Sequence, residues 1–356
     1  MDFELGPEGQ EAERAAAWLE AEGKAFTALS GLDAAALRVA LLAAQGALAG
    51  PGSRAVAPLL AVARRSAPLF LALEATRHLR DLVGSLGPGG LPEGEIAALA
   101  RGERIGAVAL ADSAEAPPAH LARSGDGWRL TARKSFVTNA PVADWIAVFA
   151  DSDGREAVCL VSPREAGVRP GERMDLMGLD GLAVAALAAE DAPLPASRVL
   201  GPFADRAASA RYARDANLSI AVAAAGLMRG ALRAAHRHAR DHRRDGRPVF
   251  SRQEVAFKLA EVLALTEAAE LLCYRASWMV ETADPGADTV VRCAKVFCTE
   301  SAERAASACL QVMGGEGYRK GNAAERAYRD AKGLALAGTT VEVARMAIAD
   351  ALLSRA

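Results

Sequence analysis

The segments QVMGGEGY at residues 311–318 and ERAYRDAK at residues 325–332 carry most of the information about how this chain folds. Gly314, Gly315 and Gly317 have no side chains, so the backbone N–H groups of this segment can approach a phosphate or a ribose closely. A helix end followed by a flexible turn accounts for a lone glycine pair equally well. Only the pattern of the rest of the chain separates these two interpretations.

Hydrophobic periodicity divides the chain into three regions. Up to about residue 101 the sequence is rich in Ala and Leu at helical spacing. From about residue 104 to 200, short apolar runs such as WIAVF at 145–149 alternate with turn clusters, which indicates an antiparallel sheet. Long helical segments follow, at about 207–241 and 253–282 and after Ala287 and Thr340. We predict an α+β fold with a helical domain at 1–102, a central antiparallel β-domain at 103–202 and a C-terminal helical bundle at 203–356.

Composition and charge describe an ordinary globular chain. Of its 356 residues 51% are hydrophobic, and the formal net charge of −2 gives no electrostatic reason to bind nucleic acid or an anionic membrane. The five cysteines are scattered without a C-x-x-C pair, as expected for reduced thiols. The opening residues MDFEL lack the pattern of a signal peptide. The most apolar stretch, residues 220–228, is shorter than the roughly 20 residues of a membrane span. We therefore expect a cytoplasmic protein.

Several segments, taken in order, resemble the acyl-CoA dehydrogenase superfamily of flavoproteins. They are GLDG at 178–181, EDAPLP at 190–195, QEVAFKLA at 253–260, QVMGGEGY at 311–318, ERAYRDAK at 325–332 and GTT at 338–340. Any one of these segments alone would be weak evidence, and their order and spacing make the resemblance specific. The first hundred residues resemble the superfamily only in their helical character and in ERIGA at 103–107.

The resemblance implies an N-terminal helical domain, a central antiparallel β-domain and a C-terminal four-helix bundle. It also implies that FAD lies between the last two domains at a subunit interface, in a dimer or tetramer. The usual reaction is α,β-desaturation of an acyl-CoA thioester, in which a carboxylate removes the α-proton and the flavin N5 takes the β-hydride.

The same resemblance implies a set of cofactor-binding residues. The Thr138 hydroxyl matches the group that meets flavin N5, and Phe136 stands where a tryptophan usually covers the ring. The segment that contains the glycine pair would reach the cofactor of a neighbouring subunit. His242 replaces an arginine that contacts FAD. The full predicted set is Phe136, Thr138, His242, Gln311, Gly314, Gly315 and Thr339.

Departures from the superfamily pattern predict weaker binding. The loop that holds the flavin and the pantetheine arm is replaced by ADSAEAPP at residues 111–118, and Arg214 and Asn217 replace the Asp and Arg that hold CoA. Each lost hydrogen bond removes roughly 0.5–1.5 kcal/mol, so we expect FAD to be weakly held or shared. His238 and His242 lie one helical turn apart, but arginines crowd them, so we expect no metal site.

The position of the catalytic base is the sharpest departure. Ala337 occupies the place of the glutamate in the superfamily's E-G-T motif, and Ala216 occupies the alternative position used by some members. Neither side chain can accept a proton, and losing a positioned base typically slows such a reaction by about 10²–10⁴-fold. The candidate substitutes are Glu74, on an N-terminal helix, and Asp215, beside Ala216, and Glu74 is favoured because its neighbours are apolar. For both residues an ordinary helix carboxylate is the simpler interpretation.

Three functions remain open at this point. The chain is a working FAD enzyme with a relocated base or with a substrate that needs none, or it is a non-catalytic subunit whose glutamate-bearing relative supplies the base. Alternatively, it is an offshoot with other flavin chemistry that needs no base for an α-proton. The first two interpretations both predict an acyl-CoA dehydrogenase-like protein, with an acyl-CoA or related thioester as its substrate and a homo- or hetero-oligomeric assembly.

Overall fold

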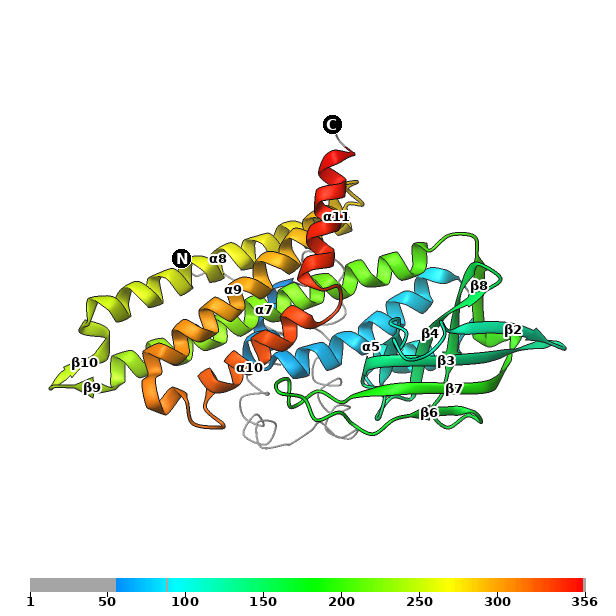
Figure 1. The fold of residues 1–356 in the computed structure, drawn as a ribbon, viewed down its shortest axis with the longest axis horizontal. Helices are drawn as coiled ribbons and strands as arrows, with labels where there is room; N and C mark the ends of the chain where they lie inside the picture. Colours follow the sequence, from blue (N-terminus) through cyan, green and yellow to red (C-terminus); the bar gives the residue numbers. More distant parts are fainter. Residues whose placement is uncertain (1–55, 88, 355–356) are drawn as a thin grey trace.

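The computed structural model describes residues 56–87 and 89–354 (Figure 1). The N-terminal part contains α4 (Val56–Arg65), α5 (Ala67–Leu86) and α6 (Glu95–Ala100). The hydroxyl of Ser66 accepts a hydrogen bond from the backbone N–H of Leu69, and Pro68 occupies the first turn, so α5 has a defined start. The predicted helical character holds over these elements, and the part of that prediction that falls on residues 1–55 lies outside the described residues.

An eight-stranded sheet follows. Its strands are β1 (Gly106–Ala109), β2 (His120–Ser124), β3 (Gly127–Thr138), β4 (Trp145–Ser152), β5 (Arg155–Val161), β6 (Val168–Pro170), β7 (Val184–Pro195) and β8 (Val199–Phe203). They are ordered β6-β7-β3-β2-β4-β5-β8, with β1 beside β4. All pairs are antiparallel except β1–β4 and the single bridge between β2 and β4. Strand β3 alternates buried and exposed side chains, whereas nearly every residue of β4 is buried, because α5 covers this part of the sheet.

The C-terminal part is a bundle of long helices. It contains α7 (Ala207–Asp241), α8 (Gln253–Glu281), α9 (Ala287–Gly317), α10 (Ala323–Leu336) and α11 (Val341–Leu353). Between α7 and α8 lie the two-residue strands β9 (Arg243–Arg244) and β10 (Arg247–Pro248), which pair with each other. Figure 1 shows α7 to α10 side by side, with α11 projecting away from them. The predicted fold class is confirmed: helices, a mainly antiparallel sheet and a helical bundle follow one another along the chain.

Helix α7 is the element that joins these parts. Its first half packs against α5, and its second half packs against α4, α8 and α9. Ala221 to Ala225 are all fully buried. Within this helix, an 18-residue stretch has a mean hydropathy of 1.3, so it is long and apolar enough to cross a membrane. The apolar stretch of α7 is therefore longer than the residues 220–228 recognised in the sequence. Of that stretch, 67% is buried inside the protein, as in a central core helix.

Two glycines of α7 set its closest approach to another helix. A Cβ built on Gly226 would lie 2.4 Å from the Cβ of Ala63, and one built on Gly230 would lie 2.5 Å from the carbonyl oxygen of Arg64. The backbones of α4 and α7 can come this close only because Gly226 and Gly230 of α7 have no side chains. Because Gly226 and Gly230 are four residues apart, they lie on the same face of α7.

We expect Gly226→Ala to destabilise the protein by about 1–3 kcal/mol, because the added methyl group must push α4 away from α7. Gly84→Ala is the matched control: Gly84 lies on α5, and a Cβ added there would have no atom within 4 Å, so this change should stabilise the helix by up to about 1 kcal/mol. Thermal and urea denaturation of both variants would measure the difference. Equal effects of the two substitutions would contradict this account of the α4–α7 contact.

Candidate functional site

The turn between α10 and α11 carries the first of the two expected base positions. Ala337 ends α10 in an extended conformation, and Gly338 follows with a φ of +64°. A Cβ on Gly338 would lie 2.9 Å from Oδ1 of Asn217, so glycine is required there. Asn217 holds the turn from both sides: its Nδ2 donates to Oγ1 of Thr339 at 3.0 Å, and its Oδ1 accepts from the Thr339 backbone N–H at 3.1 Å.

Lys295 contacts the end of α10, directly before the same turn. This fully buried lysine of α9 donates a hydrogen bond from its Nζ to the carbonyl oxygen of Ala335 at 2.8 Å. The carbonyls of the last helical turn lack partners within the helix and carry negative partial charge, so a cation is favourable there. Burial lowers the pKa of Lys295 to about 8, although the carboxylates of Glu342 and Glu300 oppose the shift.

Asn217 also connects the two expected base positions, because it follows Ala216 directly on α7. Ala337 and Ala216 are both partly buried. The turn itself carries no carboxylate, since Gly338 and Thr339 follow Ala337. The structure thus brings the two alanines into one neighbourhood through the Asn217–Thr339 pair.

Glu74 lies within the same neighbourhood but is already held by other groups. Its side chain is 1% exposed, and its two carboxylate oxygens accept hydrogen bonds from Nε and Nη2 of Arg77 at 2.7 and 2.6 Å. Ser219 of α7 donates to the second oxygen at 2.5 Å. Burial alone would raise the pKa of Glu74, but the Arg77 charge and its hydrogen bonds, with smaller effects of His78 and Ser219, lower it to about 2. A carboxylate in this state is a weak base, and its assignment as the substitute base stays a prediction.

The grouping of Glu74, Ser219 and His78 does not form a nucleophilic triad. His78 Nε2 lies 3.1 Å from the Ser219 hydroxyl oxygen, which already donates to Glu74. In a triad the imidazole stands between the hydroxyl and the carboxylate, whereas here the hydroxyl stands between the other two. Ser219 is 3% exposed, so it is also closed to a substrate. The group therefore joins α5 to α7.

The end of β3 carries the predicted flavin contacts. Phe136 has a φ of +52° and interrupts the register between β3 and β7, so its ring is turned outward and is 68% exposed. Thr138 ends the strand partly exposed, and its hydroxyl makes no hydrogen bond to the described residues. Asn139 then donates from Nδ2 to the carbonyl oxygens of Ala72 and Gly106 at 2.8 and 3.1 Å. The strand end is thus fastened to α5, close to Glu74.

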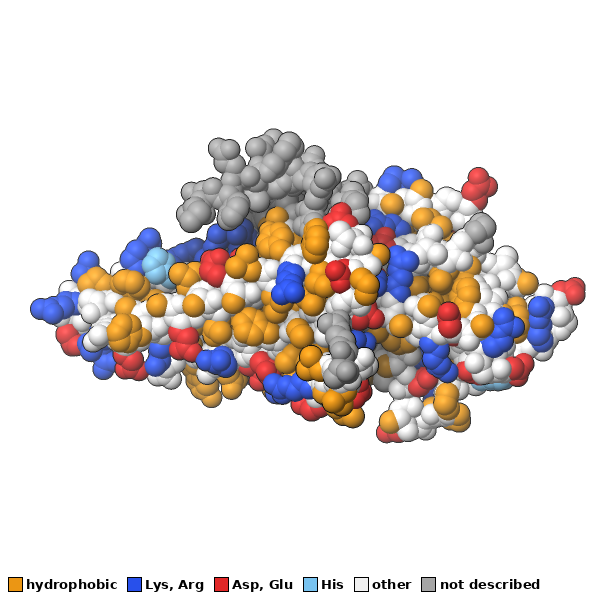
Figure 2. Space-filling view, turned by 90° about the horizontal axis from the view of Figure 1, so that it is seen from above, with side chains coloured by type: hydrophobic (Ala, Val, Ile, Leu, Met, Phe, Trp, Pro, Cys, Tyr) orange, Lys and Arg blue, Asp and Glu red, His pale blue; other side chains and the backbone are white. Residues whose placement is uncertain are grey.

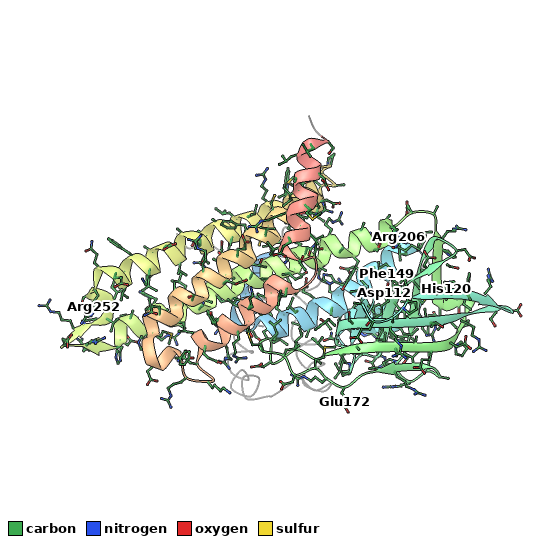
Figure 3. All side chains as sticks on the ribbon, in the orientation of Figure 1. Asp112, His120, Phe149, Glu172, Arg206 and Arg252 are labelled. Carbon is green, nitrogen blue, oxygen red and sulfur yellow. The ribbon has the colours of Figure 1, made fainter. Side chains whose placement is uncertain are left out.

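In the loop at residues 111–118, the carboxylate of Asp112 is bound by other groups of the protein. Asp112, labelled in Figure 3, lies 2.6 Å from Nζ of Lys134 and also accepts the backbone N–H of Ala119 at 3.2 Å. Lys134 is buried, and desolvation lowers its pKa although the carboxylate of Asp112 opposes the shift. The loop therefore holds its own conformation through Lys134 and Ala119.

The remaining predicted contacts lie at the far end of the bundle. Gly314 kinks α9 with φ +58° and ψ −141°, and no atom lies within 4 Å of a Cβ built on Gly314 or Gly315. Gln311 is exposed one helical turn earlier. His242 ends α7 and stacks on His238, with ring centroids 4.9 Å apart. Among the described residues, no group of three or more His, Cys, Asp or Glu side chains could hold a metal ion.

Two separate groups of these residues are suited to contact different parts of FAD. The exposed Phe136 ring and the unpaired Thr138 hydroxyl could lie along a flavin ring, and Thr339 is positioned by Asn217 beside Ala337. The open backbone at Gly314 and Gly315 could approach a phosphate or ribose, and it faces away from its own chain. The predicted residues thus form two groups rather than one pocket.

Sequence reasoning missed Arg77, His78, Ser219 and Lys295. A signal exists for Lys295, because it stands at helical spacing among Val291, Cys298 and Ala302, all of which are buried. Glu74, Arg77, His78 and Asp81 on α5 have the spacing of a solvated helix face, and only the packing of α7 shows that part of this face is buried.

Comparisons with known proteins agree with this geometry. Family profiles for the acyl-CoA dehydrogenase middle domain and C-terminal domain match residues 111–192 and 212–353. The chain is 32% identical over 264 residues to a 3-(aryl)acrylate reductase of Clostridium sporogenes, covering 71% of this chain and 70% of that protein. It is 30% identical over 270 residues to the mitochondrial short-chain specific acyl-CoA dehydrogenase of Bos taurus, covering 72% of this chain but only 65% of that protein.

A solved structure extends the likeness to the whole fold. Butyryl-CoA dehydrogenase from Megasphaera elsdenii superposes with a TM-score of 0.90 over 99% of this chain and 100% of that chain, at 23% sequence identity. At this identity the likeness concerns the fold, and the function has to be argued from the residues described above.

We expect Glu74→Gln to destabilise the protein by about 3 kcal/mol at pH 7, because it removes the carboxylate partner of the largely buried Arg77. The pKa of Glu74 is lowered from 4.5 to about 2, so its contribution to the free energy of unfolding is present above pH 4.5 and is lost as the pH falls toward 2. Urea denaturation at several pH values should show a difference from wild type that shrinks below pH 4.5.

Glu103→Gln provides the control, because Glu103 forms a solvent-exposed pair with Arg101 and its loss should leave the urea midpoint unchanged. A Glu74→Gln variant as stable as wild type at pH 7 would show that the ion pair does not hold α5 against α7.

Proposed function

This chain belongs to the acyl-CoA dehydrogenase family, and we propose that it is an FAD-dependent flavoprotein of acyl-CoA thioesters that lacks a general base of its own. The family's enzymes use FAD to oxidise the CH–CH bond next to a thioester. Bound FAD would supply the hydride acceptor. Phe136 and Thr138 would position its ring, and Gln311, Gly314 and Gly315 would contact the part of FAD that belongs to a neighbouring subunit.

One observation carries the proposal of a missing base. Ala337 ends α10 on a turn that is fully built, with Gly338, Thr339, Asn217 and Lys295 all in place around it. Only the carboxylate is absent. The α-proton of a thioester is weakly acidic, so desaturation needs a proton acceptor next to that carbon. Desaturation by this chain alone should therefore be slow.

A second candidate function follows from the same observation. A subunit that keeps the scaffold and the open glycine segment, but not the base, is suited to work beside a glutamate-bearing relative. In that assembly this chain would contribute cofactor contacts across the interface, and the relative would carry out the proton transfer. Co-expression with such a relative should then give a stable mixed complex that is active where each subunit alone is not.

Exposed apolar side chains support an oligomer. Phe257, Leu271 and Trp278 of α8 are 63%, 68% and 54% exposed, and Met346 of α11 is 68% exposed. Figure 2, which looks down on α8 and α11, shows hydrophobic side chains along much of this face. Apolar side chains gathered on one face mark a protein interface, so we propose that a second subunit covers α8 and α11.

We expect Ala337→Glu to raise the rate of butyryl-CoA oxidation with an artificial electron acceptor by about 10²–10⁴-fold, because it restores a carboxylate on an intact turn. Leu336→Glu is the matched control: it adds the same charge one residue earlier, on a side chain that is 64% exposed, and should leave the rate unchanged. Ala216→Glu is the second site at which a gain is expected.

The wild-type rate decides between the candidate functions. Fast oxidation by the wild type alone would rule out both the missing base and the non-catalytic subunit. No gain from either glutamate, in protein that still binds flavin, would favour a flavin chemistry that needs no base for an α-proton.

We expect Leu271→Glu to shift the protein from an oligomer to a monomer, because it places a charge in the apolar face of α8. Flavin content should fall in parallel if the cofactor is held between subunits. Ile96→Glu, on an exposed apolar residue of α6, serves as the control and should change neither property. Light scattering after size-exclusion chromatography and the flavin absorbance of the same peak would measure both. An unchanged mass would place the interface elsewhere.

A further inference from the structure

The connection between β6 and β7 reaches out of the sheet and lies against α10 (Figure 1). The backbone N–H of Leu179 donates to Oδ1 of Asp330 at 2.6 Å. Beside it, Nη1 of Arg329 donates to the carbonyl oxygen of Met177 at 2.7 Å and to Oδ2 of Asp180 at 2.8 Å. Three hydrogen bonds thus join this loop to two adjacent residues of α10.

The loop and α10 also fit closely at two glycines. A Cβ built on Gly178 would lie 2.6 Å from the carbonyl oxygen of Arg329, and one built on Gly333 would lie 2.9 Å from Cδ1 of Leu179. Leu179 itself has a φ of +58°, which a leucine rarely adopts, and its side chain is buried. Such a backbone persists only where surrounding contacts hold it. Here the hydrogen bond to Asp330 and the contact with Gly333 provide that hold.

The carboxylate of Asp330 is suited to this contact. Burial raises its pKa to about 6, although the hydrogen bond from Leu179 and the charge of Arg329 oppose the shift. The group is therefore ionised at pH 7.5, and a charged acceptor makes a stronger hydrogen bond to an N–H than a neutral one does. A carboxylate that loses hydration needs a donor in return, and the Leu179 N–H supplies it.

The far end of the loop leads directly to the predicted flavin contacts. The carbonyl oxygen of Leu179 accepts the backbone N–H of Leu182 at 2.8 Å, which closes a tight turn. The carbonyl oxygen of Ala183 then accepts the backbone N–H of Asn139 at 2.6 Å. Thr138 pairs with the next residue of the loop, the first of β7. A continuous run of backbone contacts therefore joins α10 to the end of β3.

Helix α10 carries the other part of the candidate site. Ala337 follows Asp330 by seven residues, which is two helical turns and about 10 Å along the axis. A contact that holds α10 at Asp330 therefore also sets the place of the turn that follows it. The loop thus spans the boundary between the sheet, with Thr138, and the bundle, with Ala337 and Thr339.

We propose that the loop at residues 178–183 acts as a clamp that fixes Thr138 relative to the turn after α10, with Asp330 as the positioning residue. The proposal rests on the proposed function in one respect, because it takes Thr138 to contact FAD. Asp330 is no part of the predicted cofactor-binding set and acts through the loop. The clamp makes FAD binding depend on a side chain of α10 that lies two turns before Ala337.

A double-mutant cycle on FAD binding tests the clamp, with the Kd of FAD measured by equilibrium dialysis of the full-length protein at pH 7.5. We expect Thr138→Val to raise the Kd about fivefold, as the loss of one hydrogen bond would. Asp330→Ala should raise the Kd about threefold in the wild-type background. It should leave the Kd unchanged in the Thr138→Val background, because both substitutions act on the same contact. Asp330→Asn keeps the Oδ1 acceptor and should restore the wild-type Kd.

Glu156→Ala is the matched control for a general loss of stability. Glu156 is also a buried carboxylate that accepts a backbone N–H, that of Ser209 at 3.1 Å near the start of α7. Its removal should lower the urea midpoint and leave the Kd of FAD unchanged in both backgrounds. Asp180→Ala removes an exposed bond of the clamp and should raise the Kd about twofold. It decides by the same criterion if Asp330→Ala does not fold.

Multiplicative effects of Asp330→Ala and Thr138→Val, or no effect of Asp330→Ala on the Kd, would overturn the clamp and leave the proposed function standing. Equal losses in Asp330→Asn and Asp330→Ala would overturn the role of Asp330 as the acceptor. A wild type that binds no FAD, or an unchanged Kd in Thr138→Val, would overturn the FAD contact of the proposed function together with the clamp. The two failures are therefore distinguishable.

Discussion

The packing of α7 against all of its neighbours is the constraint on which the rest of the structure depends. Its first half faces α5 and the sheet, and its second half forms the centre of the bundle. Three hydrogen-bonded pairs connect α7 and its neighbours: Asn139 with Ala72, Glu74 with Ser219, and Asn217 with Thr339. They fasten β3 to α5, α5 to α7, and α7 to the turn after α10. The candidate site is the place where these links converge.

The ion pair between Glu74 and Arg77 shows what opposes the use of this carboxylate as a base. A base must accept a proton near neutral pH, whereas this carboxylate is held ionised by a bidentate guanidinium and a hydroxyl. The same contacts join α5 to α7, so releasing the carboxylate for proton transfer would weaken that contact. Structural and catalytic demands on Glu74 therefore oppose each other, which favours a base from outside the chain or a reaction that needs none.

The sequence predicted the order of helices, sheet and bundle, because long apolar periods and turn clusters are local signals. The ends of α7 and the start of α8 agree with the predicted segments 207–241 and 253–282. The placement of Phe136 and Thr138 at the end of β3 could also be predicted from the motif around them. The partners of Glu74 could not, because Arg77 and His78 have the spacing of a solvated helix face. Their burial depends on α7, about 140 residues further along the chain.

The turn after α10 explains why a missing carboxylate need not change the fold. Its conformation depends on the positive φ of Gly338, on the paired hydrogen bonds of Asn217 with Thr339, and on Lys295 beneath the end of α10. None of these contacts involves the side chain at residue 337. Loss of a glutamate there would remove a proton acceptor and leave the geometry around it unchanged. The conformation of this turn is thus independent of whether residue 337 carries a proton acceptor.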